Sequence, residues 1–264
     1  MTAEVPARTV PGMRGTDAER KRDGSRSSLV ADILEKVIAA RAAQAGRAAL
    51  DIVDVGAGTG GLAVSMARAG HRVTVVDPSP DALAAARWRA AETGVTLIEV
   101  QGEAADLPGL VGTATADLVI CHNVLEYVDS PSAALAAIAR VLRPGGAVSV
   151  LAANAVAAVL QRALAGRYAE ARAMLPGTAQ EAEVPSGTAA AARPFTLPEL
   201  TALIEGAGLR AGEAYGVRIF SGLLPSAGAD PATADALREL EEAAATVPPL
   251  RDIATRLHIL GYRA

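Results

Sequence analysis

The sequence has few cysteines, few aromatic residues and no histidine cluster. Cys121 is the only cysteine among 264 residues, which excludes an internal disulfide framework and a metal site built from several cysteines. Aromatic residues make up 3% of the chain, although hydrophobic residues reach 51%, and alanine supplies much of that content. We therefore expect helices that pack through small side chains. The histidines, His71, His122 and His258, are not spaced as metal ligands are, so no metal is expected.

The sequence also lacks a strong net charge and a long apolar run. A net charge of -4 gives no overall attraction for nucleic acid, so a nucleic-acid substrate would have to bind a local basic patch. The longest apolar tract, 147–160, is too short to cross a bilayer. The first residues lack the cationic and apolar stretches of a signal peptide. We expect a cytoplasmic protein with no membrane association.

From residue 50 onward, strand-like runs rich in Val, Ile and Leu alternate with helical segments. Strands are predicted at 50–55, 72–76, 96–100, 117–121 and 147–151. Helices are predicted at 61–70, 80–93, 104–110 and 131–142. This alternation is typical of βαβ units with a parallel sheet, and strands apolar along their whole length indicate helices on both faces. The pattern predicts an α/β fold with a Rossmann-like, doubly wound sheet.

The two ends of the chain have a different character. Residues 1–27 are predicted to be a flexible tail, of which 14–28 can order as a lid, and Ser27 or Ser28 is expected to cap the first helix. The remainder, 28–264, is expected to be one domain, in which 154–194 is a helical insertion over the acceptor side. Further predicted elements are a helix at 154–175, a loop at 176–194, a helix from Thr196, strands at 209–219 and 257–262, and a helix at 231–246.

A glycine-rich loop follows the first predicted strand and opens a helix. Glycines at this place allow a tight turn and a close approach of the backbone to a nucleotide-like ligand. The loop fits two spacings: Asp54, Gly56, Gly58 and Gly60 suit a methyltransferase, and Gly56, Gly58 and Gly61 suit a dinucleotide-binding protein. The loop alone therefore leaves both classes open.

Later segments favour the methyltransferase class. Asp77 ends the second strand, where an acid can accept both ribose hydroxyls, and Pro78 follows it. Glu103, Ala104 and Ala105 follow the third strand, where methyltransferases commonly carry Gly-Asp-Ala against adenine. The segments 117–128 and 141–146 resemble those around the fourth and fifth strands of class I methyltransferases, and Pro-Gly-Gly at 144–146 is predicted to be a turn. These signals predict S-adenosylmethionine (SAM) as cofactor, with S-adenosylhomocysteine as product, and the class I strand order 3-2-1-4-5-7-6.

The residues after the fourth strand are candidates for the reacting centre, because ligands of open α/β sheets bind beyond the carboxyl ends of the strands. His122 is either a general base or a residue that packs on the cofactor. Cys121 is expected to be a buried strand residue. Glu126 and Tyr127 either face the acceptor or begin the next helix.

The C-terminal half carries more specific segments. They are His-Asn-Val-Leu-Glu-Tyr-Val at 122–128, Ala-Gly-Arg-Tyr at 165–168, Gly-Val-Arg-Ile-Phe at 216–220, Glu-Leu-Glu at 239–241 and Arg-Leu-His at 256–258. With them the chain resembles, from about residue 26 to its end, the bacterial tRNA 5-carboxymethoxyuridine methyltransferase family, which methylates the carboxylate of that wobble nucleoside. The resemblance implies cofactor contacts from Arg26, Gly56, Ala57, Gly58, Asp77, Ala104, Ala105 and His122.

A carboxylate acceptor implies a particular set of partners. It is ionised at neutral pH and can attack without a base, but it needs cationic groups to hold it. Arginine suits carboxylates through its planar fork. Arg167, Arg218 and Arg256 are the predicted acceptor-binding residues, and His122, Arg218 and Tyr168 the predicted catalytic ones, with Tyr168 as a hydroxyl donor.

Other functions stay open from the sequence. A small-molecule O-methyltransferase acting on a carboxylate, phenol or quinone precursor fits the acidic composition, whose pI is about 5.5. A SAM-binding partner protein without activity is a remote alternative, and a dehydrogenase a more remote one. We expect a monomer or a homodimer, with tRNA or a small molecule as acceptor.

Overall fold

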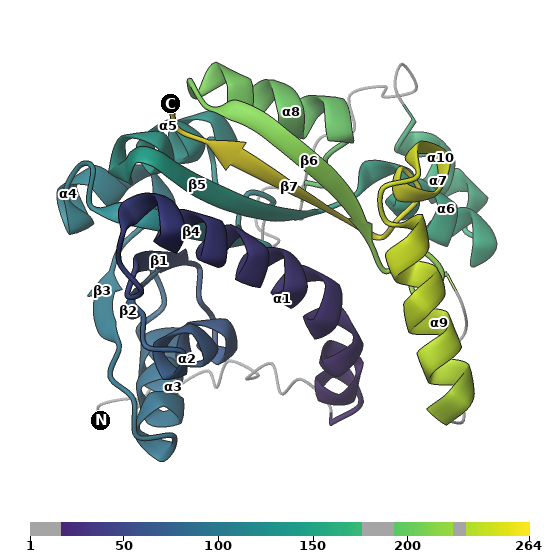
Figure 1. The fold of residues 1–264 in the computed structure, drawn as a ribbon. Coiled ribbons are helices and arrows are strands. Elements are labelled where there is room, and N and C mark those ends of the chain that lie inside the picture. Colours follow the sequence, from purple (N-terminus) through teal and green to yellow (C-terminus); the bar gives the residue numbers. More distant parts are fainter. Residues whose placement is uncertain (1–16, 176–192, 224–230) are drawn as a thin grey trace, which may run out of the picture.

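The computed structural model describes residues 17–175, 193–223 and 231–264, which form one seven-stranded sheet with helices on both faces (Figure 1). The strand order is β3-β2-β1-β4-β5-β7-β6, so the predicted α/β fold and its strand order are confirmed. The strands are β1 (Asp51–Val55), β2 (Arg72–Asp77), β3 (Ile98–Gln101), β4 (Ala116–His122), β5 (Leu142–Ala153), β6 (Arg210–Val217) and β7 (Arg256–Tyr262).

Strand direction decides where a ligand can bind. The first five strands are parallel, and β7 pairs antiparallel with both β5 and β6. Because β1 pairs with β2 on one side and β4 on the other, the strand order reverses at β1. In doubly wound sheets such a reversal opens a crevice beyond the carboxyl ends of the strands, which is where the glycine-rich loop lies.

The helices lie in two layers. One layer holds α1 (Asp17–Ala45), α2 (Gly61–Arg68) and α3 (Pro80–Glu92), and the other holds α4 (Leu107–Val111), α5 (Pro131–Val141) and α8 (Leu197–Gly206) (Figure 1). Each layer covers its own hydrophobic core. The other helical elements are the 3-10 turn η1 (Ala104–Asp106), α6 (Ala155–Leu164), α7 (Tyr168–Ala173), α9 (Pro231–Ala244) and α10 (Pro248–Arg251).

Several helices begin where a side chain caps them. The Ser79 hydroxyl accepts a hydrogen bond from the amide of Ala82 at the start of α3. Thr196 accepts one from the Glu199 amide, while the Glu199 carboxylate accepts one from the Thr196 amide, so α8 begins with a reciprocal capping box. The predicted cap at Thr196 is thereby confirmed.

A buried carboxylate joins α1 to the amino end of the sheet. Asp117 is fully buried at the start of β4, and a buried charge needs close partners. Arg41 of α1 lies 3.1 Å from its Oδ1, Arg143 of β5 lies 3.0 Å from its Oδ2, and Arg47 pairs with the same carboxylate. These ion pairs fix the amino end of the sheet and leave the opposite end for ligands.

Three sequence predictions of local structure are wrong. The first helix does not begin at Ser27 or Ser28, because α1 starts at Asp17 and no proline interrupts it before those serines. The helix predicted at 154–175 is two helices, α6 and α7, since Gly166 adopts a left-handed φ of 74° that ends the first of them.

The third wrong prediction concerns the Pro-Gly-Gly segment, 144–146. It lies inside β5 instead of forming a separate turn. The pairing with β4 shifts there, from Ala116 opposite Leu142 to Leu118 opposite Ala147, so the strand absorbs the extra residues as an irregularity. Residues 1–16 of the predicted tail at 1–27 and most of the predicted loop at 176–194 lie outside the described residues.

Candidate active site

The glycine-rich loop between β1 and α2 is held against the end of β2. The amide of Gly58 donates to Asp77 Oδ2 at 3.2 Å, and the amide of Ser79 donates to Asp77 Oδ1 at 2.9 Å. The amide of Gly56 donates to the carbonyl of Val76 at 2.7 Å. The acid at the end of the second strand and the loop therefore form one unit, as the sequence spacing predicts.

The surroundings of the loop glycines differ from one position to the next. Gly56, Gly58 and Gly60 all have positive φ, at 65°, 52° and 71°. A Cβ on Gly56 would lie 2.5 Å from Val124 Cγ2, and one on Gly60 would lie 2.7 Å from Ala86 Cβ, so packing excludes side chains there. A Cβ on Gly58 would meet no atom within 4 Å. The backbone at Gly58 thus borders open space, as a close approach to a ligand requires.

Two carboxylates lie at the carboxyl ends of β1 and β2. Asp54 is only 5% exposed and Asp77 only 8%. Burial, with a smaller contribution from the nearby charge of Asp77, raises the pKa of Asp54 to about 7. Asp54 is therefore partly protonated near neutral pH, whereas the two oxygens of Asp77 accept hydrogen bonds from the amides of Gly58 and Ser79.

The residues predicted to contact adenine follow β3 beside this pair. The amide of Gly102 donates to the carbonyl of Asp77 at 3.3 Å, which brings the ends of β2 and β3 together. Glu103 is the residue before η1 and is exposed; Ala104 is buried and Ala105 exposed. Pro78 is exposed and its carbonyl accepts a hydrogen bond from Gln101. Their contact with adenine stays a prediction.

His122, the last residue of β4, is linked to two residues that the sequence did not identify as functional. Its Nε2 lies 2.8 Å from Ser149 Oγ on β5, and Ser149 Oγ lies 2.7 Å from His258 Nε2 on β7. Burial lowers the pKa of His122 to about 4, so the imidazole is neutral at physiological pH. The strand pairing of β4, β5 and β7 brings these residues together, and it is not visible in local sequence.

The backbones of Arg218 and Arg256 lie close together at the carboxyl edge of β5. Val217 pairs with Arg256, Arg256 pairs with Ala153, and the amide of Thr255 donates to the carbonyl of Arg218 at 3.2 Å. Arg256 Nη1 donates to Glu126 Oε1 at 3.1 Å, and the amide of Ala153 donates to the same oxygen. Glu126 is thus a buried residue of the site, whereas Tyr127 is 62% exposed.

The loop after Arg218 is fixed by one carboxylate from α9. Glu241 Oε2 accepts a hydrogen bond from the amide of Ile219 at 2.7 Å, and its Oε1 accepts from the amides of Phe220 and Ser221 at 3.0 and 2.7 Å. Arg218 itself has a positive φ of 60°, which is rare for a residue with a side chain. Glu241 therefore holds the backbone beside a predicted acceptor residue.

The remaining predicted residues lie apart from this cluster. Tyr168 begins α7 and is 72% exposed, and the Arg167 guanidinium lies 3.4 Å from Glu170. Within the described part of the chain, no hydrogen bond or ion pair joins either side chain to Arg256 or His122. Arg26 lies within α1, and its side chain is outside the described structure. The roles of these three residues stay predictions.

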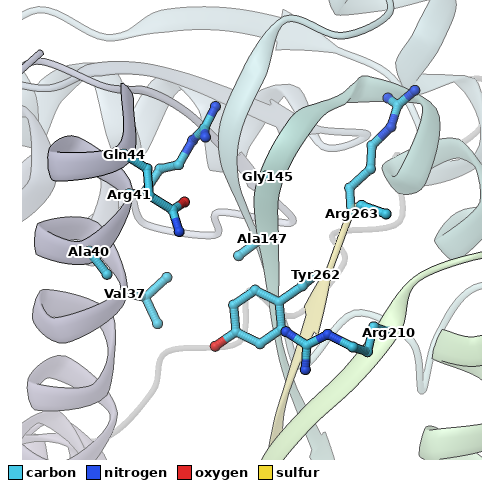
Figure 2. Close-up of a pocket in the computed structure, with 10 residues that line it drawn as sticks. Val37, Ala40, Arg41, Gln44, Gly145, Ala147, Arg210, Tyr262 and Arg263 are labelled. Carbon is cyan, nitrogen blue, oxygen red and sulfur yellow. The ribbon is translucent and has the colours of Figure 1, made fainter. Parts of the chain in front are cut away.

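A cavity of about 320 Å³ lies at the opposite end of the sheet from the glycine-rich loop, between α1 and β5, β6 and β7 (Figure 2). Its arginines already have partners inside the protein. Arg41 donates to Asp117, Arg263 donates to carbonyls of the α5–β5 segment, and Arg210 stacks 4.8 Å from the centre of the Tyr262 ring. This cavity is separate from the glycine loop, and we assign the chemistry to the carboxyl edge.

The described residues contain no group of three metal-ligating side chains. Among the same residues, no helix is both long and apolar enough to cross a membrane. Cys121 is fully buried, and burial raises the pKa of its thiol, so it is an inert strand residue as expected.

Known proteins are similar to this chain in sequence. Residues 53–150 match the family model described as a methyltransferase domain. The chain is 36% identical over 131 residues to the ubiquinone biosynthesis O-methyltransferase of Xanthomonas euvesicatoria pv. vesicatoria (strain 85-10). The aligned region covers 48% of this chain and 53% of that enzyme. It is 27% identical over 240 residues to the tRNA 5-carboxymethoxyuridine methyltransferase of Escherichia coli (strain K12), covering 90% of this chain and 88% of that enzyme. The chain thus spans about half the length of the first relative and most of the second.

Solved structures share the fold. A SAM-dependent methyltransferase from Methanosarcina mazei superposes with a TM-score of 0.54 at 18% identity, over 81% of this chain and 92% of that chain. The cyclase SpnF superposes with a TM-score of 0.52 at 19% identity, over 81% of this chain and 75% of that chain. Because a cyclase shares the fold, the fold by itself does not define the reaction.

The family match and the site geometry define the class. Residues 53–150 form a methyltransferase domain of the class I fold. The cofactor of this domain is S-adenosylmethionine, which confirms the prediction of SAM over a nicotinamide cofactor. The resemblance to the tRNA 5-carboxymethoxyuridine methyltransferases is confirmed as a similarity over nearly the whole chain.

Proposed function

We propose that this protein transfers the methyl group of SAM to a carboxylate oxygen, with the carboxylate of 5-carboxymethoxyuridine at the tRNA wobble position as acceptor. The observation that carries the proposal is that the backbone of Arg218 lies beside Arg256 beyond the carboxyl end of β5, where Val217 pairs with Arg256 and the amide of Thr255 donates to the carbonyl of Arg218. Two arginines at the ligand-binding edge suit an acceptor that carries a negative charge. The similarity to the E. coli tRNA enzyme over 90% of the chain supports the nucleoside.

The loop and the two acids have the features that a SAM site needs. SAM, when bound, supplies a methyl group on a positively charged sulfur. The open backbone at Gly58 can lie against it, and Asp77 can accept hydrogen bonds from the ribose hydroxyls. Glu103 and Ala105 follow β3, where the adenine of such a cofactor lies in a doubly wound fold.

The acceptor side then needs orientation more than acid–base chemistry. A carboxylate is already ionised at neutral pH, so its oxygen can attack the methyl carbon without losing a proton. Holding the oxygen in line with the bond that breaks, and excluding water, can supply most of the acceleration. Arg218 holds the acceptor carboxylate in this proposal. Arg256 has a different part, because its Nη1 is committed to Glu126, and it adds positive charge and fixes that edge of the site.

A small-molecule carboxylate, phenol or quinone precursor is the second candidate acceptor. The 36% identity to a ubiquinone biosynthesis O-methyltransferase favours it, although the match covers only 53% of that enzyme. The net charge of -4 favours it as well, because tRNA binding usually draws on an excess of basic residues. For a phenol, unlike a carboxylate, removal of a proton would be required, and the pH dependence of the rate would then report a base.

The decisive experiment uses methyl-labelled SAM and bulk tRNA from a strain that lacks the 5-carboxymethoxyuridine methyltransferase. After digestion, mass spectrometry identifies the labelled nucleoside. Label in the methyl ester of 5-carboxymethoxyuridine supports the proposal. Label only in a phenol or quinone precursor, tested in parallel, supports the second candidate, and SAM binding without transfer to either supports a partner protein without activity.

Variants and salt sharpen this test. We expect Arg218→Ala to abolish transfer while SAM still binds; loss of both would indicate a structural role for Arg218. Arg238→Ala is the matched control, because that arginine is exposed on α9 and pairs with Glu242. With tRNA as acceptor, the KM should rise steeply with salt, since contacts to several phosphates release counterions. A KM that does not change with salt would contradict a tRNA acceptor.

A further inference from the structure

A polar row crosses three strands on the face of the sheet that α1 covers. His122 pairs with Leu151, and Leu151 pairs with His258, so the two histidines lie on either side of β5. Ser149, two residues before Leu151, points to the same face and lies between them. Its hydroxyl is 2.8 Å from Nε2 of His122 and 2.7 Å from Nε2 of His258. The serine therefore bridges the two rings through the same nitrogen of each.

The inner part of this row is closed to water. Ser149 and His258 are both 0% exposed, and within the described structure Nδ1 of His258 has no hydrogen-bond partner. His122 lies at the end of β4 and is only partly buried, so its other nitrogen, Nδ1, belongs to the carboxyl edge of the sheet. The row thus runs from the dry interior to the candidate active site.

The described residues offer Ser149 Oγ no hydrogen-bond partner besides these two nitrogens, so two arrangements use its single proton in a hydrogen bond. In the first, His258 Nε2–H donates to Ser149, and the Ser149 hydroxyl donates to His122 Nε2; His122 then carries its proton on Nδ1. In the second, all donors and acceptors are reversed, and His122 presents a bare Nδ1. Both rings are neutral, because burial lowers the pKa of His122 to about 4 and that of His258 to about 3.

The orphaned nitrogen of His258 separates the two arrangements. The first leaves His258 Nδ1 as a bare acceptor without a partner. The second leaves a buried N–H at Nδ1 without a partner, and orphaned buried N–H groups are rarer in proteins than under-satisfied acceptors. The first arrangement is therefore favoured.

We propose that Ser149 and His258 are positioning residues that hold His122 as its Nδ1–H tautomer, so that His122 presents a hydrogen-bond donor, and not a base, at the active site. The donor's partner is an oxygen of the acceptor carboxylate. The identity of this partner rests on the function proposed above. An acceptor that is ionised already gains nothing from a base but is stabilised and oriented by a donor. The tautomer itself does not depend on the acceptor and can be measured without it.

The chain is well suited to a direct measurement of this tautomer. It contains only three histidines, so protein labelled with ¹⁵N-histidine gives three ring systems in long-range ¹H–¹⁵N correlation spectra. His71 is the internal reference for the opposite tautomer, because its Nδ1 accepts from the amide of Leu50 at 3.3 Å, and it is assigned with His71→Gln. We expect His122 protonated at Nδ1 and His258 at Nε2. A protonated Nε2 on His122 would overturn the proposal.

Two variants test whether the row sets the tautomer. In Ser149→Ala the bridge is lost, and we expect His122 to show a mixture of tautomers, with kcat reduced about tenfold and SAM affinity unchanged. In His258→Gln the side-chain amide can still donate to Ser149, so the tautomer of His122 and kcat should both be retained. A Ser149→Ala protein with the parent tautomer would contradict the proposal. If transfer to carboxylates fails but the tautomer is as expected, only the proposed function falls.

Discussion

Arg256 Nη1 on β7 lies 3.1 Å from Oε1 of Glu126, 130 residues earlier in the chain. The Glu126 side chain is 1% exposed and the Arg256 side chain 29%. Oε1 also accepts from the amide of Ala153, and Oε2 has no partner among the described residues. The pair thus joins the segment after β4 to β5 and β7 at the edge where we assign the acceptor.

Removing one partner of this pair should destabilise the protein. Arg256→Ala leaves the buried carboxylate of Glu126 without its counter-charge, and we expect the free energy of unfolding to fall by about 2–4 kcal/mol. Urea unfolding without SAM measures this loss. In the matched control, Arg238→Ala, an exposed pair with Glu242 is removed and no measurable change is expected. Equal stability of the Arg256 variant and the parent would show that Glu126 does not depend on Arg256.

The open space at Gly58 predicts a variant that separates SAM binding from stability. Gly58→Ala and Gly46→Ala both place a side chain at positive φ with no atom within 4 Å of the new Cβ. Each should therefore lower the free energy of unfolding by a similar amount, about 1 kcal/mol. Only Gly58 lies in the loop where we place the cofactor, so calorimetry should find SAM affinity reduced by about tenfold or more for Gly58→Ala. An unchanged affinity in that variant would place the cofactor elsewhere.

Asp54 makes stability depend on pH. Its pKa is raised to about 7 in the folded protein from an ordinary 3.8, so between these values the folded state keeps a proton that the unfolded state has released. The stability that the folded protein gains from keeping this proton is fully present at low pH and is lost as the pH rises to about 7. Asp54→Asn lacks it, so the stability of the variant relative to the parent should increase by about 1–2 kcal/mol from pH 5 to pH 7. Parallel pH profiles of the two proteins would contradict the raised pKa.

Glu241 is expected to act on the acceptor side through the backbone. Its carboxylate accepts three amide hydrogens from 219–221, directly after Arg218. Glu241→Gln turns one of the accepting oxygens into a donor, so we expect the loop to loosen and methyl transfer to fall about tenfold or more, with SAM affinity unchanged. Glu239→Gln, two residues away and exposed, is the control and should behave as the parent. If SAM affinity falls in the Glu241 variant, the loop also supports the cofactor.

The sequence by itself determined the sheet and the cofactor side of the site. Strand runs rich in Val and Ile, the glycine loop from Gly56 and the acid Asp77 are local patterns, because each element and its turn are formed by residues close in the chain. The strand order followed from the class that these patterns indicate. The sequence placed the start of α1 wrongly and missed the break at Gly166, since helix boundaries depend on weak local preferences.

Only the tertiary structure decided what the acceptor side can do. The sequence predicted that His122 is a general base or packs on the cofactor, and that Arg256 binds the acceptor. Strand pairing of β4, β5 and β7 instead gives His122 a bridge to His258 through Ser149, and it gives Arg256 a buried partner in Glu126. His258 lies 109 positions after Ser149 and Arg256 lies 130 positions after Glu126, and the cost of burying their polar atoms depends on which partners they meet after folding. That cost cannot be read from sequence spacing, because it is set by the neighbours that the sheet brings together.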